Sequence, residues 1–343
     1  MASNKKKKRK AQRMVLMTAC IVMGVVLMVL LSATVYAEYL LNQMNYYSPG
    51  SQETLSAEEA EKFLNETDPE DGDYTGPEEN GENVEPGQAG EILPTSENVI
   101  NILLIGADYQ SGEMARSDSM ILCTFNKTRN TITMTSFMRD MYVKIPGYGK
   151  NRINASYTVG GMKLLEKTLE QSFGVSVNGI VEIDFSHFED LIDLLGGVEI
   201  ELSSLEADFI NLKNSDTLVA GTHILNGKQA LWYSRYRTDG GDFKRTDRQR
   251  IVLGKLIENY RSASLAELLS MMDDILPMVT TDMQKNEILS YVTGLFPMLI
   301  NAEIITQRIP AEGGYYMTKI DGKSVLVPDI SFNVQILKDT ITE

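Results

Sequence analysis

From about residue 98 onward, apolar residues recur in short runs and at helical spacing along this 343-residue chain. Residues 99–105 are a continuous apolar run, which predicts a buried strand. Residues 119–125 and 131–136 flank a short polar turn, as the two strands of a hairpin do. Residues 161–173 carry apolar positions at helical spacing, and residues 178–185 predict another strand.

The same alternation continues toward the C-terminus. Residues 186–189 have the form of a capping box, which predicts the start of a helix that ends near Gly196, before an extended segment at residues 198–202. Residues 226–233 predict a short helix. Residues 246–261 predict a longer helix that opens with a second capping box.

Two further helices are predicted near residues 265–276 and 282–300, and strand and helix signals continue to about residue 338. No long structureless gap interrupts this order of elements. The sequence therefore predicts an α/β fold, a mixed α-β-α sandwich with a central sheet, over residues 98–343.

The N-terminus has a different pattern. Residues 5–10 and Arg13 carry seven positive charges, and the 24 residues from 14 to 37 carry none. As a helix this run would be about 36 Å long, enough to cross a bilayer core of roughly 30 Å. A cleaved signal peptide is the alternative, but its apolar region would exceed the usual limit of about 15 residues.

The flanking charges predict the orientation of this membrane helix. Lysine and arginine remain on the cytoplasmic side, so residues 1–13 are predicted to be cytoplasmic and everything after residue 37 to be exported. Nucleic-acid binding by the basic run is the competing interpretation, and the adjoining apolar segment disfavours it. We therefore expect a single-pass protein of the cell membrane with no nucleic-acid partner.

Residues 38–97 are strongly acidic and poor in apolar side chains. Between residues 51 and 98 there are 15 acidic residues and one lysine. A chain of this composition buries too little apolar surface to offset the entropy lost on ordering, so a solvated extracellular tether is predicted. Much of the formal net charge of -15 lies in this segment, which leaves a mildly acidic domain.

Against that background, residues 234–250 (SRYRTDGGDFKRTDRQR) contain five arginines and one lysine. Guanidinium groups are always charged and bind phosphate through paired donors, so the stretch favours a phosphoryl ligand. The predicted start of the helix at residue 246 would add free backbone N–H groups. The alternative is a surface network in which Asp239, Asp242 and Asp247 neutralise three of the cations.

Two other segments carry polar residues at strand ends. Asp108 and Asp118 border one loop between predicted strands, and paired carboxylates near phosphate are typical ligands of Mg²⁺. Two aspartates alone are a weak signal for a metal. Arg139 and Asp140 lie together at the end of another predicted strand.

Seven motifs in order carry a resemblance to a known family. They are NILLIGAD (101–108), RSDSM (116–120), SFMRDMYVKIPG (136–147), NRINASYTVGG (151–161), DLLGGVEIEL (193–202), LNGKQALWYSRYR (225–237) and GDFKRTDRQR (241–250). The chain resembles the LytR-CpsA-Psr family, and the predicted anchor and exported orientation also fit that family.

The resemblance implies an enzyme of Gram-positive cell-wall assembly. Such enzymes transfer a glycopolymer, such as teichoic acid or capsular polysaccharide, from a polyprenyl pyrophosphate carrier to peptidoglycan and form a phosphodiester. A binding or scaffolding protein that holds the lipid-linked precursor without transferring it, including a regulator of the attenuator type, remains the alternative. Both functions are compatible with the sequence.

The resemblance also implies residue roles. Asp108 and Asp118 correspond to the magnesium ligands. The residues predicted to be catalytic are Arg116, Asp118, Arg139 and Asp140, and Asp118 or Asp140 is a candidate general base. The residues implied to bind pyrophosphate are Arg116, Arg139, Arg235, Arg237, Arg245 and Gln249, with Arg248 as a further candidate. Met138 departs from the family pattern, which usually has proline before the Arg-Asp pair.

Overall fold

The computed structural model describes residues 36, 38–39, 41–47, 55–65, 78–79, 84–109, 116–261 and 263–342. The chain divides into two units, Met1–Met44 and Asn45–Glu343. The predicted cytoplasmic segment 1–13 lies outside the described residues, as does the predicted membrane helix 14–37 except for Tyr36. Among the helices that the structure describes, none is long and apolar enough to cross a membrane.

Within the described part of the second unit, a seven-stranded mixed sheet has the order β1-β11-β8-β3-β4-β5-β12. Its outer pairs β1–β11 and β5–β12 and the inner pair β8–β3 are parallel, and its other pairs are antiparallel. Its strands are β1 (Asn45–Tyr46), β3 (Val99–Asp108), β4 (Arg116–Asn126), β5 (Thr131–Phe137), β8 (Gly179–Asp184), β11 (Thr280–Thr281) and β12 (Glu303–Ile309).

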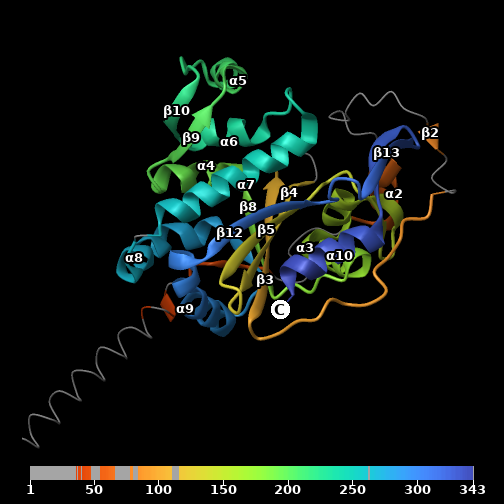
Figure 1. Cartoon of the computed structure of the whole chain (residues 1–343), viewed down its shortest axis with the longest axis horizontal. Helices are drawn as coiled ribbons and strands as arrows, with labels where there is room; N and C mark the ends of the chain where they lie inside the picture. Colours follow the sequence, from red (N-terminus) through yellow and green to blue (C-terminus); the bar gives the residue numbers. More distant parts are fainter. Residues whose placement is uncertain are drawn as a thin grey trace, which may run out of the picture. The chain divides into compact units, whose positions relative to one another are not determined.

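Helices cover both faces of this sheet (Figure 1). Helices α3 (Ile153–Phe173) and α10 (Ile330–Ile341) lie on one face. The other face is covered by α4 (Phe185–Leu194), α6 (Gly227–Arg235) and α7 (Gly241–Asn259). The predicted α-β-α sandwich with a central mixed sheet is therefore confirmed.

Smaller elements extend these layers. The remaining helices in the described part of the chain are α2 (Ala57–Asn65), α5 (Ser204–Asn214), α8 (Leu265–Ile275), the 3₁₀ turn η1 (Leu276–Met278) and α9 (Lys285–Asn301). Strands β9 (Val198–Leu202) and β10 (Gly221–Leu225) pair, β6 (Tyr142–Ile145) pairs with β7 (Gly149–Arg152), and β13 (Tyr315–Ile320) lies between β14 (Lys323–Pro328) and β2 (Glu78–Glu79).

The apolar run of β3 faces two separate cores. Leu103 packs with α3 residues in the largest buried cluster, and Leu104 packs on the other face with Leu253 of α7. Strand β4 alternates in the same way, with Leu122 in the first cluster and Ile121 in the second. A sheet covered by helices on both faces needs apolar residues on both, which explains the continuous rather than alternating pattern.

Most predicted elements are present, and the predicted hairpin at residues 119–136 is β4–β5. Helix α3 begins at Ile153, eight residues before the predicted start at residue 161, and both predicted capping boxes were wrong. Helix α4 begins one residue before Ser186, and Asp184 is its N-cap because its side chain accepts from the His187 backbone N–H. Helix α7 begins at Gly241, so Thr246 is inside the helix, where its hydroxyl donates to the Phe243 carbonyl.

The predicted tether 38–97 is not solvated throughout. Residues 84–98 pack along the domain, where Val84 and Leu93 are buried and the Leu93 backbone N–H donates to the Gly174 carbonyl at 2.8 Å. Gly174 has a φ of 71°, and a Cβ there would lie 2.5 Å from the Glu91 carbonyl oxygen. Residues 84–98 therefore pack on the domain that was predicted to begin at residue 98, and single buried residues such as Leu93 leave no periodic signal in the sequence.

Candidate functional site

A β-bulge positions Asp118 at the end of the central sheet. In the β3–β4 register, Gly106 pairs with Ser119 and Ala107 pairs with Ser117, so Asp118 has no partner opposite it. An extra residue of this kind bends the strand and redirects a side chain, and bulges are frequent next to functional sites. Gly106 allows the close approach, since a Cβ there would lie 3.1 Å from the Ser119 Cβ.

Arginines from two other elements surround Asp118. Arg139, which follows β5, donates from Nη1 to Asp118 Oδ1 at 2.8 Å. Arg245 of α7 donates to the Asp118 backbone carbonyl at 3.1 Å, and its Nη1 lies 3.8 Å from Asp118 Oδ1. Both arginine side chains are almost fully buried. Because buried cations need compensating anions, this cluster is a strongly charged site inside the protein.

Asp242 is the residue of this cluster that the sequence did not single out as functional. Its Oδ1 lies 2.8 Å from Arg245 Nη2 and 3.7 Å from the Nε atoms of both Arg139 and Arg237. One carboxylate thus holds three guanidinium groups together. Asp242 lies three residues before Arg245, and residues at this spacing on a helix are neighbours. Had the helix been predicted to begin at Gly241, this spacing would have indicated the ion pair.

Arg235 and Arg237 reach the site from the end of α6. Arg235 Nη2 lies 3.7 Å from Asp108 Oδ2, and its guanidinium lies 4.6 Å from the centre of the Phe185 ring. About a quarter of each arginine side chain is exposed, against 2% for Arg245. These two arginines therefore face solvent and the space beside the cluster, where a ligand can meet them.

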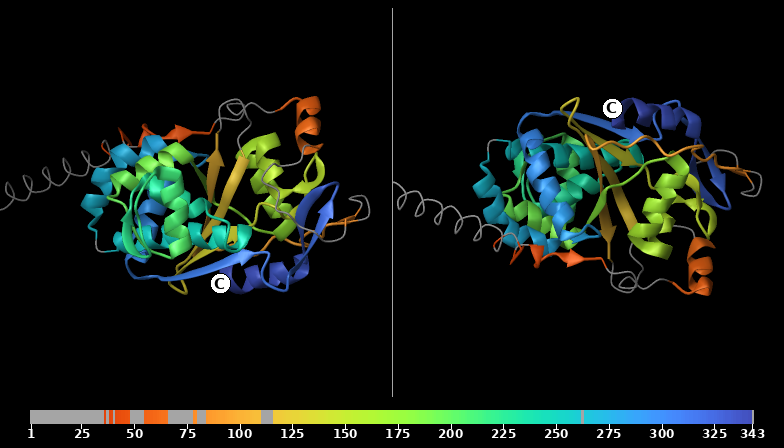
Figure 2. Two further views of the ribbon diagram at one scale, coloured as in Figure 1. Left: turned by 90° about the horizontal axis from the view of Figure 1, so that it is seen from above. Right: turned by 90° about the horizontal axis from the view of Figure 1, so that it is seen from below.

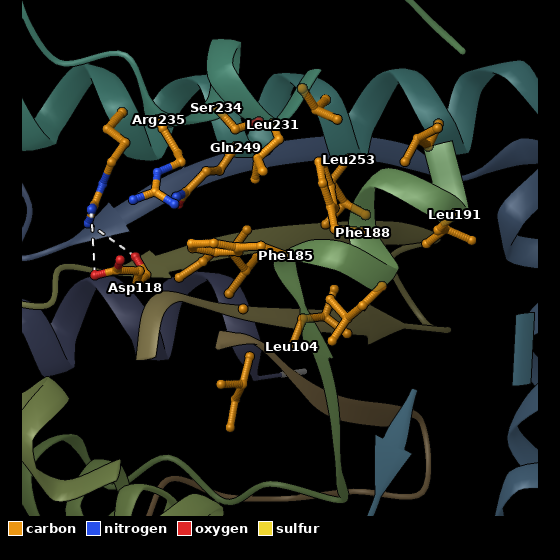
Figure 3. Close-up of a pocket in the computed structure, with 18 of the residues that line it drawn as sticks. Leu104, Asp118, Phe185, Phe188, Leu191, Leu231, Ser234, Arg235, Gln249 and Leu253 are labelled. Carbon is orange, nitrogen blue, oxygen red and sulfur yellow. Dashed lines mark hydrogen bonds and ion pairs between the residues drawn. The ribbon is translucent and has the colours of Figure 1, made fainter. Parts of the chain in front are cut away.

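A cavity of about 230 Å³ opens beside these arginines. Figure 3 shows Asp118, Arg235 and Gln249 toward one end of the lining and Phe188, Leu191 and Leu253 toward the other. The polar residues of the lining are Asp118, Ser119, Ser234, Arg235, Arg237, Arg245 and Gln249. The apolar residues are Leu104, Ile105, Ile121, Val181, Ile183, Phe185, Phe188, Leu191, Leu231, Val252, Leu253, Leu256 and Val279.

Gln249 adds a polar group to the lining, and its buried Oε1 makes no hydrogen bond within the described part of the chain. Ser234 Oγ, on α6, is also buried without a hydrogen bond among the described residues. Buried polar atoms normally form hydrogen bonds, so two buried polar atoms without one in the same lining indicate that a polar ligand or water binds there.

Arg248 does not line this cavity, although it was predicted as a pyrophosphate contact. Its Nε donates to Glu206 Oε1 at 2.7 Å, and its Nη1 donates to the Tyr236 carbonyl at 3.0 Å. Asp239 accepts from its third nitrogen at 2.5 Å. Because all three nitrogens are bonded within a buried network, Arg248 joins α5, the α6–α7 loop and α7. That role is structural.

Part of the basic stretch forms ion pairs, as the alternative interpretation predicted, but the arginines of these pairs are buried and not on the surface. Asp239 neutralises Arg248, and Asp247 pairs with Arg250 on the same helix. Asp242 instead belongs to the cluster with Arg245.

Arg116 and Asp140 also lie outside the lining of the larger cavity. Arg116 lines a different cavity, with its guanidinium 5.5 Å from the centre of the Phe63 ring. Asp140 lies behind the cluster, with Oδ1 at 3.7 Å from Arg139 Nε and 3.5 Å from Arg152 Nη1. Arg116 is the strand partner of Asp108, and neither Asp108 nor Arg139 lines the larger cavity either.

The pKa values of the two candidate base residues, Asp118 and Asp140, are shifted in opposite directions. Burial raises the pKa of Asp118, but the charges of Arg139 and Arg245 outweigh burial and hold this pKa below its usual value. Burial also raises the pKa of Asp140; Arg139 opposes this effect, repulsion by Asp242 adds to it, and the pKa remains above its usual value. A carboxyl with a raised pKa is the better proton acceptor near neutral pH.

Asp108 and Asp118 lie on adjacent strands beside the arginines, and each has an arginine within 4 Å. Among the described residues, no group of three or more metal-binding side chains is present. Mg²⁺ usually takes one or two carboxylates and completes its shell with water and substrate phosphate. The two aspartates fit that donor set only as partners of a phosphate ligand.

The fold and this site together define a class of protein: a layered α/β domain with an amphipathic cavity that is apolar along most of its lining and cationic at one end. Residues 47–341 match the profile of the LytR_cpsA_psr family. The chain belongs to this LytR-CpsA-Psr family.

Relatives in the family carry two kinds of name. "Regulatory protein MsrR" of Staphylococcus aureus (strain Mu50) is 34% identical over 253 residues, 71% of this chain and 75% of the relative. "Polyisoprenyl-teichoic acid--peptidoglycan teichoic acid transferase TagT" of Bacillus subtilis (strain 168) is 34% identical over 213 residues, 60% of this chain and 65% of the relative.

Solved structures of TagT have the same fold. The structure described as TagT bound to LIIa-WTA has a TM-score of 0.60 and 27% identity, and the match covers 76% of this chain and 96% of that one. The structure of YwtF (TagT) with bound octaprenyl pyrophosphate lipid has a TM-score of 0.56 and 27% identity, with coverage of 71% and 89%.

Proposed function

We propose that this chain is a phosphotransferase that moves a glycopolymer from a polyprenyl pyrophosphate carrier to peptidoglycan. The observation that carries the proposal is the amphipathic cavity, whose apolar lining suits a prenyl chain and whose arginines suit a diphosphate. The TagT structure with octaprenyl pyrophosphate supports the same ligand chemistry. The donor polymer is a teichoic acid or another wall or capsular polysaccharide.

In the proposed reaction, a peptidoglycan hydroxyl oxygen attacks the phosphorus that carries the polymer. The bond from this phosphorus to the bridging oxygen breaks, polyprenyl phosphate leaves, and a phosphodiester links polymer and peptidoglycan. Arg235, Arg237 and Arg245, with Arg139 behind them, neutralise the diphosphate and stabilise the charge that develops on the leaving phosphate. Gln249 donates to a phosphate oxygen through its amide nitrogen.

Asp140 is the better candidate for the base that takes the hydroxyl proton. Its pKa is raised, whereas that of Asp118 is held low by Arg139 and Arg245. Asp118 would instead position Arg139 and Arg245 and, with Asp108, hold Mg²⁺. When bound, this ion would supply further neutralisation of the diphosphate.

The proposed location is the cell membrane, with residues 1–13 in the cytoplasm, one span at residues 14–37 and the domain outside. Protease added to intact protoplasts should then release the domain. Protection of the domain from external protease would contradict this topology.

A transfer assay tests the proposed function directly. Purified protein, a polyprenyl pyrophosphate-linked glycopolymer and peptidoglycan should yield polymer joined to peptidoglycan through a phosphodiester, and Asp108→Ala or Asp118→Ala should lower turnover and its dependence on Mg²⁺. The name of the MsrR relative favours a second candidate, a regulator that binds the lipid-linked precursor. Tight lipid binding without any transfer to peptidoglycan would favour that second function.

A further inference from the structure

An outer arginine pair, Arg250 of α7 and Arg308 of β12, lies beside the cluster around Asp118. Figure 1 and Figure 2 show β12, in blue, next to α7 at the edge of the sheet. Alternate residues of a strand share a face, so Arg308 lies on the same face of β12 as Ile304, which packs in one apolar cluster with Leu253 of α7. The outer pair therefore meets between the helix and the sheet.

Arg250 has fewer partners than its burial requires. Its side chain is 6% exposed, and its Nη2 donates to Asp247, which is 36% exposed. Its Nε and Nη1 are buried and make no hydrogen bond among the described residues. A guanidinium carries five N–H donors, and a buried cation needs both hydrogen bonds and an anion. One partly exposed carboxylate meets only part of this need.

Arg308 adds to this deficit. Its Nε is also buried without a hydrogen bond in the described part of the chain, and its guanidinium lies 4.6 Å from the centre of the Phe243 ring. Burial lowers the pKa of Arg250, the Asp247 carboxylate opposes this effect, the positive charge of Arg308 adds to it, and the pKa stays below its usual value. An anion between the two arginines would remove their repulsion and supply the missing acceptors.

A hydroxyl group lies on the same face of the sheet. Ser136 of β5 is the strand partner of Arg308, and its Oγ is buried with no hydrogen bond to another described residue. Because buried polar atoms normally form hydrogen bonds, these unpaired donors together indicate a polar ligand. Guanidinium groups bind phosphate through paired, charge-assisted hydrogen bonds, so a phosphate group suits this set of donors.

Phe243 connects the outer pair to the proposed diphosphate site. It lies two residues before Arg245 on α7, and its ring packs against Tyr315 of β13 with the ring centres 5.6 Å apart. Both aromatic residues are partly exposed, as is Arg308. Five residues separate Arg245 from the outer pair along α7, or about 7.5 Å of helix. A polymer that leaves the diphosphate site over Phe243 would therefore bring its next charged group to the outer pair.

We propose that the outer pair, with Ser136, binds a phosphate group in the polymer part of the donor. The identity of the ligand rests on the proposed transfer reaction, in which the polymer is attached to the diphosphate held by Arg235, Arg237 and Arg245. A polymer with phosphodiesters in its backbone gains charged contacts here that an uncharged polysaccharide cannot make. The outer pair thereby selects a phosphate-bearing glycopolymer as the donor.

Donor binding by the full chain tests this selection. Two donors carry the same polyprenyl diphosphate, one with a short poly(glycerol phosphate) and the other with an uncharged oligosaccharide. The wild-type chain should bind the phosphate-bearing donor roughly tenfold or more tightly, because charged hydrogen bonds are gained. Arg308→Gln should remove most of this preference and leave the uncharged donor unaffected. Lys255→Gln, which removes an exposed charge from α7, is the matched control and should keep the preference.

Thermal unfolding without a donor separates binding from a structural role. Arg308→Gln should leave the melting temperature unchanged or raise it, because the repulsion of Arg250 is relieved. A lowered melting temperature with an unchanged donor preference would overturn the proposal, and so would equal loss of affinity for both donors. Inorganic phosphate should compete less strongly than a free poly(glycerol phosphate) oligomer, and equal competition would also overturn it. Transfer of the uncharged donor in those cases would leave the proposed function intact.

Discussion

Arg237 and Arg248 come from the same basic stretch, but replacing them should change different properties. Arg237 is about a quarter exposed, and its Nε lies 3.7 Å from Asp242 Oδ1 in an ion pair. Such a pair contributes about 0–1 kcal/mol to stability. If Arg237 binds the diphosphate, Arg237→Ala should cost about 1.5–3 kcal/mol of binding, or roughly a tenfold to hundredfold loss of affinity.

Arg248→Ala should instead lower the stability of the fold and leave lipid binding unchanged. It removes three hydrogen bonds and leaves the Glu206 carboxylate, 11% exposed, without its cation. Breaking a buried pair costs about 3–5 kcal/mol, and each kcal/mol lowers the melting temperature of a domain this size by about 2–4 °C. Binding of the lipid by the folded variant should stay near the wild-type value.

The assay is polyprenyl pyrophosphate binding beside thermal unfolding for both variants. Arg237→Lys is the matched substitution, and it should rescue binding poorly because lysine keeps the charge but loses the paired donors. A lowered melting temperature with unchanged lipid binding in Arg237→Ala would refute the reasoning. It would place Arg237 in the same structural network as Arg248.

Three further predictions concern stability. The Met138 backbone N–H donates to the Ile309 carbonyl at 2.8 Å, so Met138→Pro should cost about 1 kcal/mol or more in urea unfolding. Burial raises the pKa of Glu206, but hydrogen bonds from the Ser203 backbone and Arg248 lower it below its usual value. The Glu206 carboxylate therefore stabilises the fold above the ordinary glutamate pKa, and this stabilisation is lost as the pH falls through the lowered pKa. Glu206→Gln should reduce stability at neutral pH, and the stability of the variant should decline less steeply in acid than that of the wild-type chain. Gly174→Ala should cost more than about 1 kcal/mol, because the φ of 71° is strained for alanine and its Cβ would overlap the Glu91 carbonyl.

Each of these variants has a control. Met138→Leu keeps the backbone donor, and Glu201→Gln changes an exposed carboxylate of β9. Gly147 also has a positive φ, of 84°, but a Cβ there would meet no atom within 4 Å. Gly147→Ala therefore measures the cost of backbone strain without steric overlap. Equal losses in a variant and its control would contradict the corresponding explanation.

The order of strands and helices was largely predictable from the sequence, because burial on both faces of the sheet imposes long apolar runs. The β4–β5 hairpin is an example, since its two runs flank a polar turn. The start of α7 was not predictable in the same way. Its Gly240-Gly241 pair has the composition of a loop, but Gly241 is the first residue of the helix.

The direction of individual side chains on α7 was not predictable either. Consecutive residues on a helix point about 100° apart, so the sequence shows that Arg248 and Gln249 differ in direction but not which one faces the cavity. Gln249 faces it and Arg248 does not. The bulge at Asp118 and the three contacts of Asp242 depend on strand register and tertiary packing, which no local pattern contains.

The most direct test of the central claim is a crystal structure of the chain with bound polyprenyl pyrophosphate. We expect prenyl density among Phe188, Leu191 and Leu253, and diphosphate oxygens within hydrogen-bonding distance of Arg235, Arg237 and Arg245. Lipid bound elsewhere, or a diphosphate that contacts none of these arginines, would contradict it.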